Sequence, residues 1–312
     1  MNMNSARRSI NYIRNTSPSR NIKQSYNRNA HRQYMFIEDF SRLVPYTLSD
    51  DEFRIDIIGI EDDEKRIINT AFSRRGYINN DTTDSFREFI NNTAFVLLAY
   101  GVSYHEIVFL KEEESSTFSI ESIMYEKIRE KRKELVITIP KSVAESHNCS
   151  SYIHIPIDDT CKFSYPKVLG GEKNRKILLT QLAELSKMSI MTESLHDEKS
   201  EFDPNVYGYK SDLLIAKVSK EIRWNARTHF DKRISEFYQL YRLIEFKKAQ
   251  RKFLDYFIIE INAILLRLNE KLGFKGELVV EGKPTVEEFN NLKQRLITGD
   301  IDFIKLFNKI NI

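Results

Sequence analysis

Glycine and proline are scarce in this chain, with ten and seven among 312 residues. A compact α/β enzyme usually needs more glycine, for tight turns and for loops that wrap phosphate groups. The scarcity therefore argues against that class of protein and favours long helices joined by few loops. The sequence also lacks the G-x-x-x-x-G-K-[ST], G-x-S-x-G, H-E-x-x-H and EF-hand patterns that indicate nucleotide, hydrolase, zinc or calcium sites.

Long apolar runs are missing as well. No run approaches the roughly 20 residues that a membrane-spanning helix needs, so we expect no membrane span. The basic N-terminus is not followed by an apolar segment, and we do not expect a secretory signal. The hydrophobic fraction of 41% still allows a core, while a charged fraction of 30% means that much of the surface carries charge.

Cysteine is nearly absent, so the fold does not depend on a disulfide framework. The two cysteines, Cys149 and Cys161, lie near His147 and His154, and all four are zinc-ligand types. No pair has the short C-x-x-C spacing that clamps a metal ion, and His154 falls in an alternating strand pattern. We therefore predict two free thiols, no metal and no cofactor.

Acidic residues are missing from the first 33 positions, although the whole chain carries a net charge of only +3. Such a polar segment cannot bury enough apolar surface to offset its ordering entropy, so we predict a flexible arm unless a partner orders it. Its unbalanced charge indicates an acidic partner, either nucleic acid or protein. The arm contains seven basic residues: Arg7, Arg8, Arg14, Arg20, Lys23, Arg28 and Arg32.

The segment 34–170 has the pattern of an α/β domain. A helix is predicted to begin at Thr83 or Asp84 and to end at Gly101, since apolar residues recur there at helical spacing. Shorter helices are predicted near 65–73 and 123–132. Alternating apolar residues predict strands at 52–60, 103–110, 117–120, 135–139 and 151–157.

Helical periodicity dominates 171–272, with predicted helices near 177–188 and 213–226 and a long candidate at 233–272. A continuous helix of that length would span about 60 Å, so the pattern indicates either two helices or part of an elongated assembly. The last segment, 273–312, holds a predicted strand at 278–280 and a helix that a capping box at Thr285 and Glu288 begins.

The long candidate helix carries two different faces. The apolar face is predicted to be buried and consists of Phe253, Phe257, Ile261, Ile264 and Leu268. A basic stripe is offset from it and consists of Lys247, Lys248, Arg251 and Lys252. The stripe is either a solvated surface or a contact surface for phosphate groups, which would be bound without base readout.

One pattern joins the end of a helix to a strand. After Tyr100, the chain reads Gly-Val-Ser-Tyr-His-Glu-Ile over 101–107, and later Tyr-Pro-Lys-Val-Leu-Gly-Gly over 165–171. Long helices and a Gly-Asp-Ile-Asp-Phe turn at 299–303 follow. This order resembles the wing-to-stem region of tailed-bacteriophage portal proteins. The resemblance implies an α+β fold: a small mixed or antiparallel α/β wing, then long stem-like helices and a helical C-terminal region.

The resemblance also implies a function. Portal proteins are structural, not enzymatic, and a portal-like chain is expected to form a ring-shaped homo-oligomer of about a dozen subunits through which double-stranded DNA passes. Its expected partners are capsid, terminase and tail-adaptor proteins. It would connect head and tail at the capsid vertex of the virion, after assembly in the host cytoplasm.

Two other functions remain open on the residues alone. One is a nucleic-acid-binding protein that uses the basic arm and the basic stripe. The other is a divergent enzyme whose site combines distant residues such as His105, Glu106 and His154. His105 and Glu106 are neighbours in a predicted strand, so their side chains point to opposite faces and cannot form an acid–base pair with each other. We expect a half-buried strand there with one charge directed outward.

Overall fold

The computed structural model describes residues 54–73, 81–111, 116–123, 128–146, 148, 150–173, 175 and 235–310. The predicted arm and the predicted helices near 177–188 and 213–226 lie outside these residues. Within them the chain is a mixed α+β protein with small antiparallel sheets. The coarse α+β prediction is therefore confirmed, and of the two sheet types it named, the described pairs are antiparallel.

The described elements fall into helices and short strands. The α-helices are α3 (Asp62–Phe72), α4 (Thr82–Tyr100), α5 (Lys141–Ser146), α9 (Glu236–Leu272), α10 (Val286–Thr298) and α11 (Phe303–Ile310). Two 3₁₀ turns are η1 (Ile157–Asp159) and η2 (Lys167–Leu169). The strands are β1 (Arg54–Ile58), β2 (Val102–Lys111), β3 (Ser116–Ile123), β4 (Ile128–Glu130), β5 (Glu134–Thr138), β6 (Tyr152–Pro156), β7 (Thr160–Ser164) and β8 (Glu277–Glu281).

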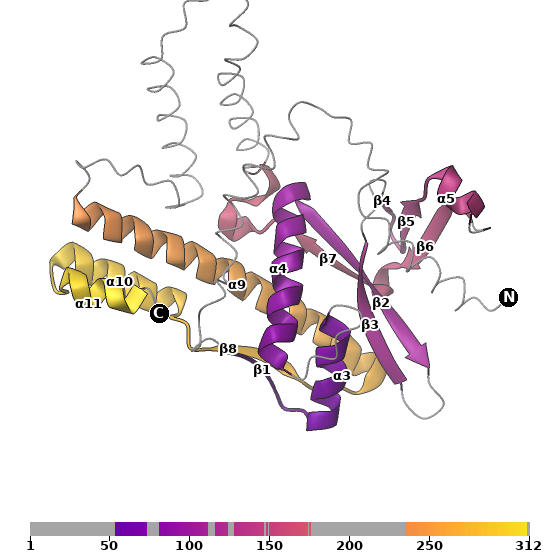
Figure 1. Ribbon diagram of the computed structural model, residues 1–312, viewed down its shortest axis with the longest axis horizontal. Coiled ribbons are helices and arrows are strands. Elements are labelled where there is room, and N and C mark those ends of the chain that lie inside the picture. The colour runs from indigo at the N-terminus through magenta and orange to yellow at the C-terminus, as the bar shows by residue number, and fades with distance from the viewer. Residues whose placement is uncertain are drawn as a thin grey trace, which may run out of the picture.

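Helix α9 is the element around which the others pack (Figure 1). It runs unbroken for 37 residues, or about 55 Å, and begins at Ser235, whose hydroxyl accepts a hydrogen bond from the Tyr238 N–H. The prediction of helix over 233–272 is confirmed, and the structure shows one continuous helix instead of two. The apolar face predicted there is buried, because Phe253, Phe257, Ile261, Ile264 and Leu268 are each at most 3% exposed.

Two cores use different halves of α9. Its C-terminal half packs against α3, α4 and the sheet β3-β2-β7, in a cluster that also includes Ile55 and Leu278 of the two-stranded sheet β1-β8. Its N-terminal half packs on α10 and α11 through Leu240, Ile244 and Phe289. A third, smaller cluster holds the sheet β4-β5-β6 together and reaches the outer face of β2 at Tyr104.

Helix α4 lies on β2 as the sequence predicts. Phe86, Phe89 and Ile90 recur at helical spacing and are buried, and the Phe89 ring contacts the Phe163 ring of β7 at 5.9 Å. The predicted starting residues are wrong by two or three positions: Asp81 is the N-cap, and its carboxylate accepts a hydrogen bond from the Asp84 N–H. The hydroxyl of Thr83 is instead used by strand β1.

The sequence prediction also fails around β4 and β7. The described residues of the predicted helix at 123–132 are not helical, because Ile123 ends β3 and Ile128 begins β4, which pairs with β5 in the register Ile128↔Ile137. Strand β7 was not predicted at all. It forms by pairing with β2, in the register His105↔Cys161. In both cases strand pairing outweighs the local pattern: β4 pairs with the next strand in a hairpin, and β7 pairs with the distant strand β2.

Gly101 ends α4 in the left-handed conformation, with φ of 82°. Glu172 and Arg175 lie against this turn: Arg175 donates to the Tyr100 carbonyl at 3.2 Å and forms an ion pair with Glu172. A Cβ at Gly101 would lie 2.6 Å from the Arg175 Nε and would also collide with the Glu172 carboxylate. The position therefore requires glycine both for its dihedral angle and for the space beside it.

We expect Gly101→Ala to destabilise the protein more than Gly273→Ala. Gly273 caps α9 with φ of 84° but has open space where a Cβ would stand, so its substitution costs only the left-handed strain of about 1–2 kcal/mol. Gly101→Ala must also displace the ion pair between Glu172 and Arg175. Urea denaturation of both variants measures the difference, and equal losses would contradict the role assigned to Glu172 and Arg175.

Candidate functional site

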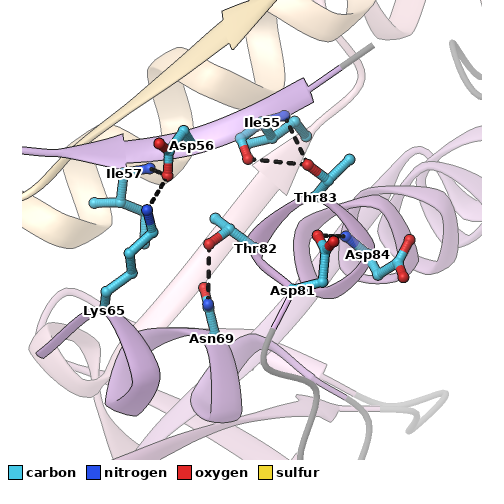
Figure 2. Close-up of polar contacts among 9 residues, drawn as sticks. All are labelled: Ile55, Asp56, Ile57, Lys65, Asn69, Asp81, Thr82, Thr83 and Asp84. Carbon is cyan, nitrogen blue, oxygen red and sulfur yellow. Dashed lines mark hydrogen bonds and ion pairs between the residues drawn. The ribbon is translucent and has the colours of Figure 1, made fainter. Parts of the chain in front are cut away.

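A hollow of about 650 Å³ opens where β1, β8 and the facing parts of α3 and α4 meet (Figure 2). It lies at the open edge of β1, because β1 pairs only with β8 in its sheet. The residues that line it are Arg54, Ile55, Asp56, Asp62, Lys65, Arg66, Asn69, Asp81, Thr82, Thr83 and Glu281. The hollow is therefore mainly polar and carries charges of both signs.

Along the open edge of β1, side chains form hydrogen bonds with backbone groups that no neighbouring strand pairs with. The Thr83 hydroxyl accepts a hydrogen bond from the Ile55 N–H and donates one to the Ile55 carbonyl, both at 3.1 Å (Figure 2). Next along the strand, the Ile57 N–H donates to the Asp56 carboxylate, which also forms an ion pair with Lys65. Thr83 of α4 thus makes the hydrogen bonds that a neighbouring strand would make at Ile55. At Ile57 the partner is Asp56 of the same strand, which Lys65 of α3 holds by an ion pair.

The same arrangement recurs at two other sheet edges. On β8, the Asn262 amide of α9 accepts from the Leu278 N–H at 2.7 Å and donates to its carbonyl at 3.1 Å. On β7, the Tyr256 hydroxyl accepts from the Ser164 N–H at 2.9 Å and donates to its carbonyl at 2.7 Å. We refer to Thr83, Asn262 and Tyr256 as the edge clamps. Each one satisfies both backbone groups of one edge residue.

The floor of the hollow carries a polar contact between α3 and α4. Asn69 is 2% exposed and donates through Nδ2 to the Thr82 hydroxyl at 3.0 Å. Its Oδ1 has no hydrogen-bond partner. The hollow can therefore accept a hydrogen bond at its floor and offer charged groups at its rim, but no histidine or cysteine lines it.

His105 lies far inside the protein, with His105 and Glu106 at 2% and 4% exposure. The prediction of a half-buried strand with an outward charge is therefore wrong. The inner face of β2 is covered by α4, and its outer face packs at Tyr104 against a second sheet, so both faces are covered at this point. No local sequence pattern reveals a second covering layer.

The environment of His105 is that of a neutral, hydrogen-bonded core residue. Its ring lies between the Phe89 and Phe163 rings, at centroid distances of 5.1 and 5.5 Å. The Nε2 atom lies 3.1 Å from the Ser103 hydroxyl, and Nδ1 lies 3.3 Å from the Ser122 hydroxyl. Burial lowers the pKa of His105 to about 3, so the imidazole is neutral at physiological pH.

The three residues of the enzyme hypothesis are not brought together. His105 faces α4, Glu106 points to the opposite face of β2, and His154 lies in β6 of another sheet. His154 is exposed and contacts the Glu134 carboxylate at 2.8 Å. A hydrogen bond from Lys131, together with the contact from His154, lowers the pKa of the Glu134 carboxyl group.

The zinc-type residues are described only in part, since His147 and Cys149 lie outside the described residues. Cys161 is a buried free thiol in β7, the strand that pairs with β2, and burial raises its pKa to about 12. Arg267 donates to its sulfur at 3.6 Å. Within the described part of the chain, no three His, Cys, Asp or Glu side chains lie close enough together to bind a metal ion.

The four residues of the basic stripe do not form one uniform solvated surface. Lys247, Lys248, Arg251 and Lys252 are all partly exposed, rather than fully solvated. The Arg251 side chain is 14% exposed, pairs with Asp255 at 2.7 Å and donates to the Lys283 carbonyl at 3.0 Å. Arg251 therefore fastens the turn between β8 and α10 to α9. The predicted arm residues, from Arg7 to Arg32, lie outside the described residues.

No protein-family model matches the chain, and no curated protein matches it either. None of the described helices combines the length and the apolar character that crossing a membrane requires.

We expect Thr83→Val to destabilise the protein by about 1–3 kcal/mol, because it leaves the Ile55 N–H and carbonyl without a partner at the strand edge. Thr83→Ser keeps the hydroxyl and is the matched control, which should retain most of the stability. Chemical denaturation of both variants measures the difference. A loss of stability in Thr83→Ser that equals or exceeds the loss in Thr83→Val would contradict the dominant role of the hydroxyl at this position.

Acid should destabilise the fold through His105. Between about pH 6.5 and about pH 3 the unfolded chain binds a proton at this residue that the folded chain does not, so stability falls as pH falls, by up to about 1.4 kcal/mol per pH unit. In His105→Gln this contribution is lost, and the variant should lose less stability than the parent from about pH 6 to about pH 4. Parallel urea denaturation series give the two slopes, and identical slopes would refute the assignment.

Proposed function

We propose that this chain is a portal-like structural subunit of a tailed virus, which assembles into a ring of about a dozen copies through which double-stranded DNA passes. Such a ring would connect head and tail at the capsid vertex, and would meet capsid, terminase and tail-adaptor proteins there. It would assemble in the host cytoplasm. The single observation that carries the proposal is that helix α9 is very long and exposes apolar side chains on its outer face.

Helix α9 is about three times as long as an average globular helix and has apolar side chains on more than one face. Phe257 and Ile261 point into the core, whereas Ile259 and Leu266 are 67% and 63% exposed. Residues seven apart lie on the same side of a helix, so Ile259 and Leu266 form one outward apolar stripe. Contact with a second subunit would remove this stripe from water.

The path of the chain around Gly101 is consistent with the proposal. A helix ends at Gly101, β2 starts at the next residue, and β2 forms an antiparallel hairpin with β3 while β7 pairs on its other side. The order of the helix, the glycine and the strand that follows is the one on which the resemblance to portal proteins rests, whereas β7 is not part of it. The helical layer of α10 and α11 also follows the strand β8, as in that order.

The overall charge is compatible with DNA passage. The net charge is +3, with 48 basic and 45 acidic side chains, and seven of the basic ones lie in the arm. Strong binding of many phosphates would stall a moving duplex, so a nearly neutral body suits a conduit. Ring closure needs two different, complementary surfaces on each subunit. Exposed apolar residues on α9 and on α11, such as Ile304, are available for them.

The alternative function is nucleic-acid binding by a non-viral protein that uses the arm and the basic stripe. The two functions differ in assembly state. A ring has a mass many times that of one subunit, whereas the alternative needs no more than a monomer or dimer.

We expect the purified full-length chain to have the mass of a ring of about a dozen subunits in light scattering or native mass spectrometry. The double variant Ile259→Glu and Leu266→Glu should lower that mass to one or a few subunits, because it places carboxylates in the apolar stripe. Asn290→Glu with Asn291→Glu is the matched control, since both residues are exposed on α10. A monomeric or dimeric parent that binds duplex DNA would favour the alternative.

A further inference from the structure

The outward side of α9 carries a regular pattern in its C-terminal half. Exposed and partly exposed residues follow one another there at alternating intervals of four and three positions, which is the spacing with which one α-helix packs along another. We call these six residues the outer seam: Lys252, Tyr256, Ile259, Ala263, Leu266 and Glu270. The seam contains the apolar stripe of Ile259 and Leu266 and extends it in both directions.

The packing of the chain itself uses the opposite side of the helix. Phe257 and Ile261 are buried in the core that α9 shares with α4 and the sheets, whereas Ile259, Ala263 and Leu266 are exposed. Helices α10 and α11 pack on the N-terminal half of α9, away from the seam. The outer seam is therefore left in water as a narrow apolar surface that a second helix can cover.

The two ends of the seam carry opposite charges. Lys252 lies at its N-terminal end and Glu270 at its C-terminal end, with only apolar or aromatic side chains between them. In the part of the chain that the structure describes, neither of the two forms an ion pair. A second seam that runs in the opposite direction places Lys252 beside Glu270 at both ends, whereas a parallel seam places like charges together. The charges therefore favour a second copy of this chain in the antiparallel orientation.

The middle of the seam fits the same orientation. Its positions are symmetric about Ile261, so an antiparallel copy sets Tyr256 against Leu266 and Ile259 against Ala263. The central layers thus join a large side chain to a small one. Small residues at the crossing allow the two helix axes to approach to the distance of about 8–10 Å that packed helices have.

We propose that two copies of this chain pair through the outer seam of α9, antiparallel, with Lys252 of each copy beside Glu270 of the other. The pairing goes beyond the proposed function and does not require it, because a two-fold contact closes after two copies. In a ring of about a dozen copies it would join the subunits two by two, and a second surface would join the pairs. The seam is short compared with an obligate interface, so the pair is expected to separate on dilution.

Cysteine cross-linking in the full-length chain tests the pairing directly. The double variant is Lys252→Cys with Glu270→Cys, and each single substitution is a matched control. All three carry Cys149→Ser, while Cys161 is buried and is kept. Positions 252 and 270 are about 27 Å apart along one helix, so they cannot form a disulfide within a chain. Mild oxidation at high protein concentration is followed by gel electrophoresis without reducing agent.

The expected product is a covalent dimer from the double variant alone, with no larger product, because a two-fold pair uses both seams. A ladder of larger products would indicate head-to-tail contact, and a dimer from either single variant would indicate parallel helices. Each of these results, or the absence of a cross-linked dimer, would overturn the inference.

Charge reversal tests the same contact without cysteines. Lys252→Glu alone and Glu270→Lys alone each place like charges together, and each should raise the concentration at which the pair separates by about tenfold. Combining them restores opposite charges and should return that concentration to the parent value in analytical ultracentrifugation. Lys133→Glu, at an exposed lysine outside the seam, is the matched control and should change nothing. A combined variant as weak as the single ones would contradict the contact between the two residues.

The mass of the parent chain separates this inference from the proposed function. A parent ring whose double cysteine variant gives no covalent dimer would remove the pairing and leave the ring standing. A parent dimer that gives the expected cross-link would support the pairing and remove the ring. A parent that stays a monomer at high concentration would remove both.

Discussion

The continuous apolar face of α9 is the feature on which the rest of the structure depends. Phe253, Phe257 and Ile261 are fully buried, and the Phe163 ring of β7 packs on Phe257 at 5.7 Å. The sheets are only two or three strands wide, and sheets of that size need a helix or another layer to be stable in water. Each large apolar side chain buried here contributes about 1.5–3 kcal/mol, against a net stability of about 5–15 kcal/mol for a domain. Interrupting this face would leave the small sheets with no common surface.

Polar contacts occupy the middle of the same helix, where one core ends and the other begins. Glu245 is largely buried and pairs with Lys293 of α10 at 2.7 Å, and Arg251 binds the turn before α10 one and a half turns further on. Hydrogen bonds and ion pairs have narrow geometric requirements, whereas apolar contacts are non-directional. The apolar faces therefore hold α10 and α11 against α9, and the polar contacts fix where along α9 they sit.

The fold could be read from the sequence where a single element determines its own pattern. Helix α9 was predictable because its apolar spacing and its end at Gly273 are local, and the same holds for α4 and Gly101. The strand at Ile128 was not, since only its pairing with β5 makes it extended. The hollow escaped prediction for a related reason. Its residues come from β1, β8, α3 and the start of α4. The sequence near Thr83 is typical of a helix cap, whereas its hydroxyl bonds to Ile55, which lies 28 residues earlier in the chain. The basic stripe was visible as charge, but its division by Arg251 depends on a partner 32 residues away.

The edge clamps have a consequence for a protein present in many copies. An uncovered strand edge is a template on which another chain can add a strand, and addition of that kind has no natural end. Thr83, Asn262 and Tyr256 each occupy both hydrogen-bonding groups of one edge residue, so a visiting strand would have to displace a contact that already exists. At the clamped edges of β1, β8 and β7, addition of a strand from another copy of the chain is therefore disfavoured. Any association of copies at these three edges would have to use side-chain surfaces, whose shape can limit the number of subunits.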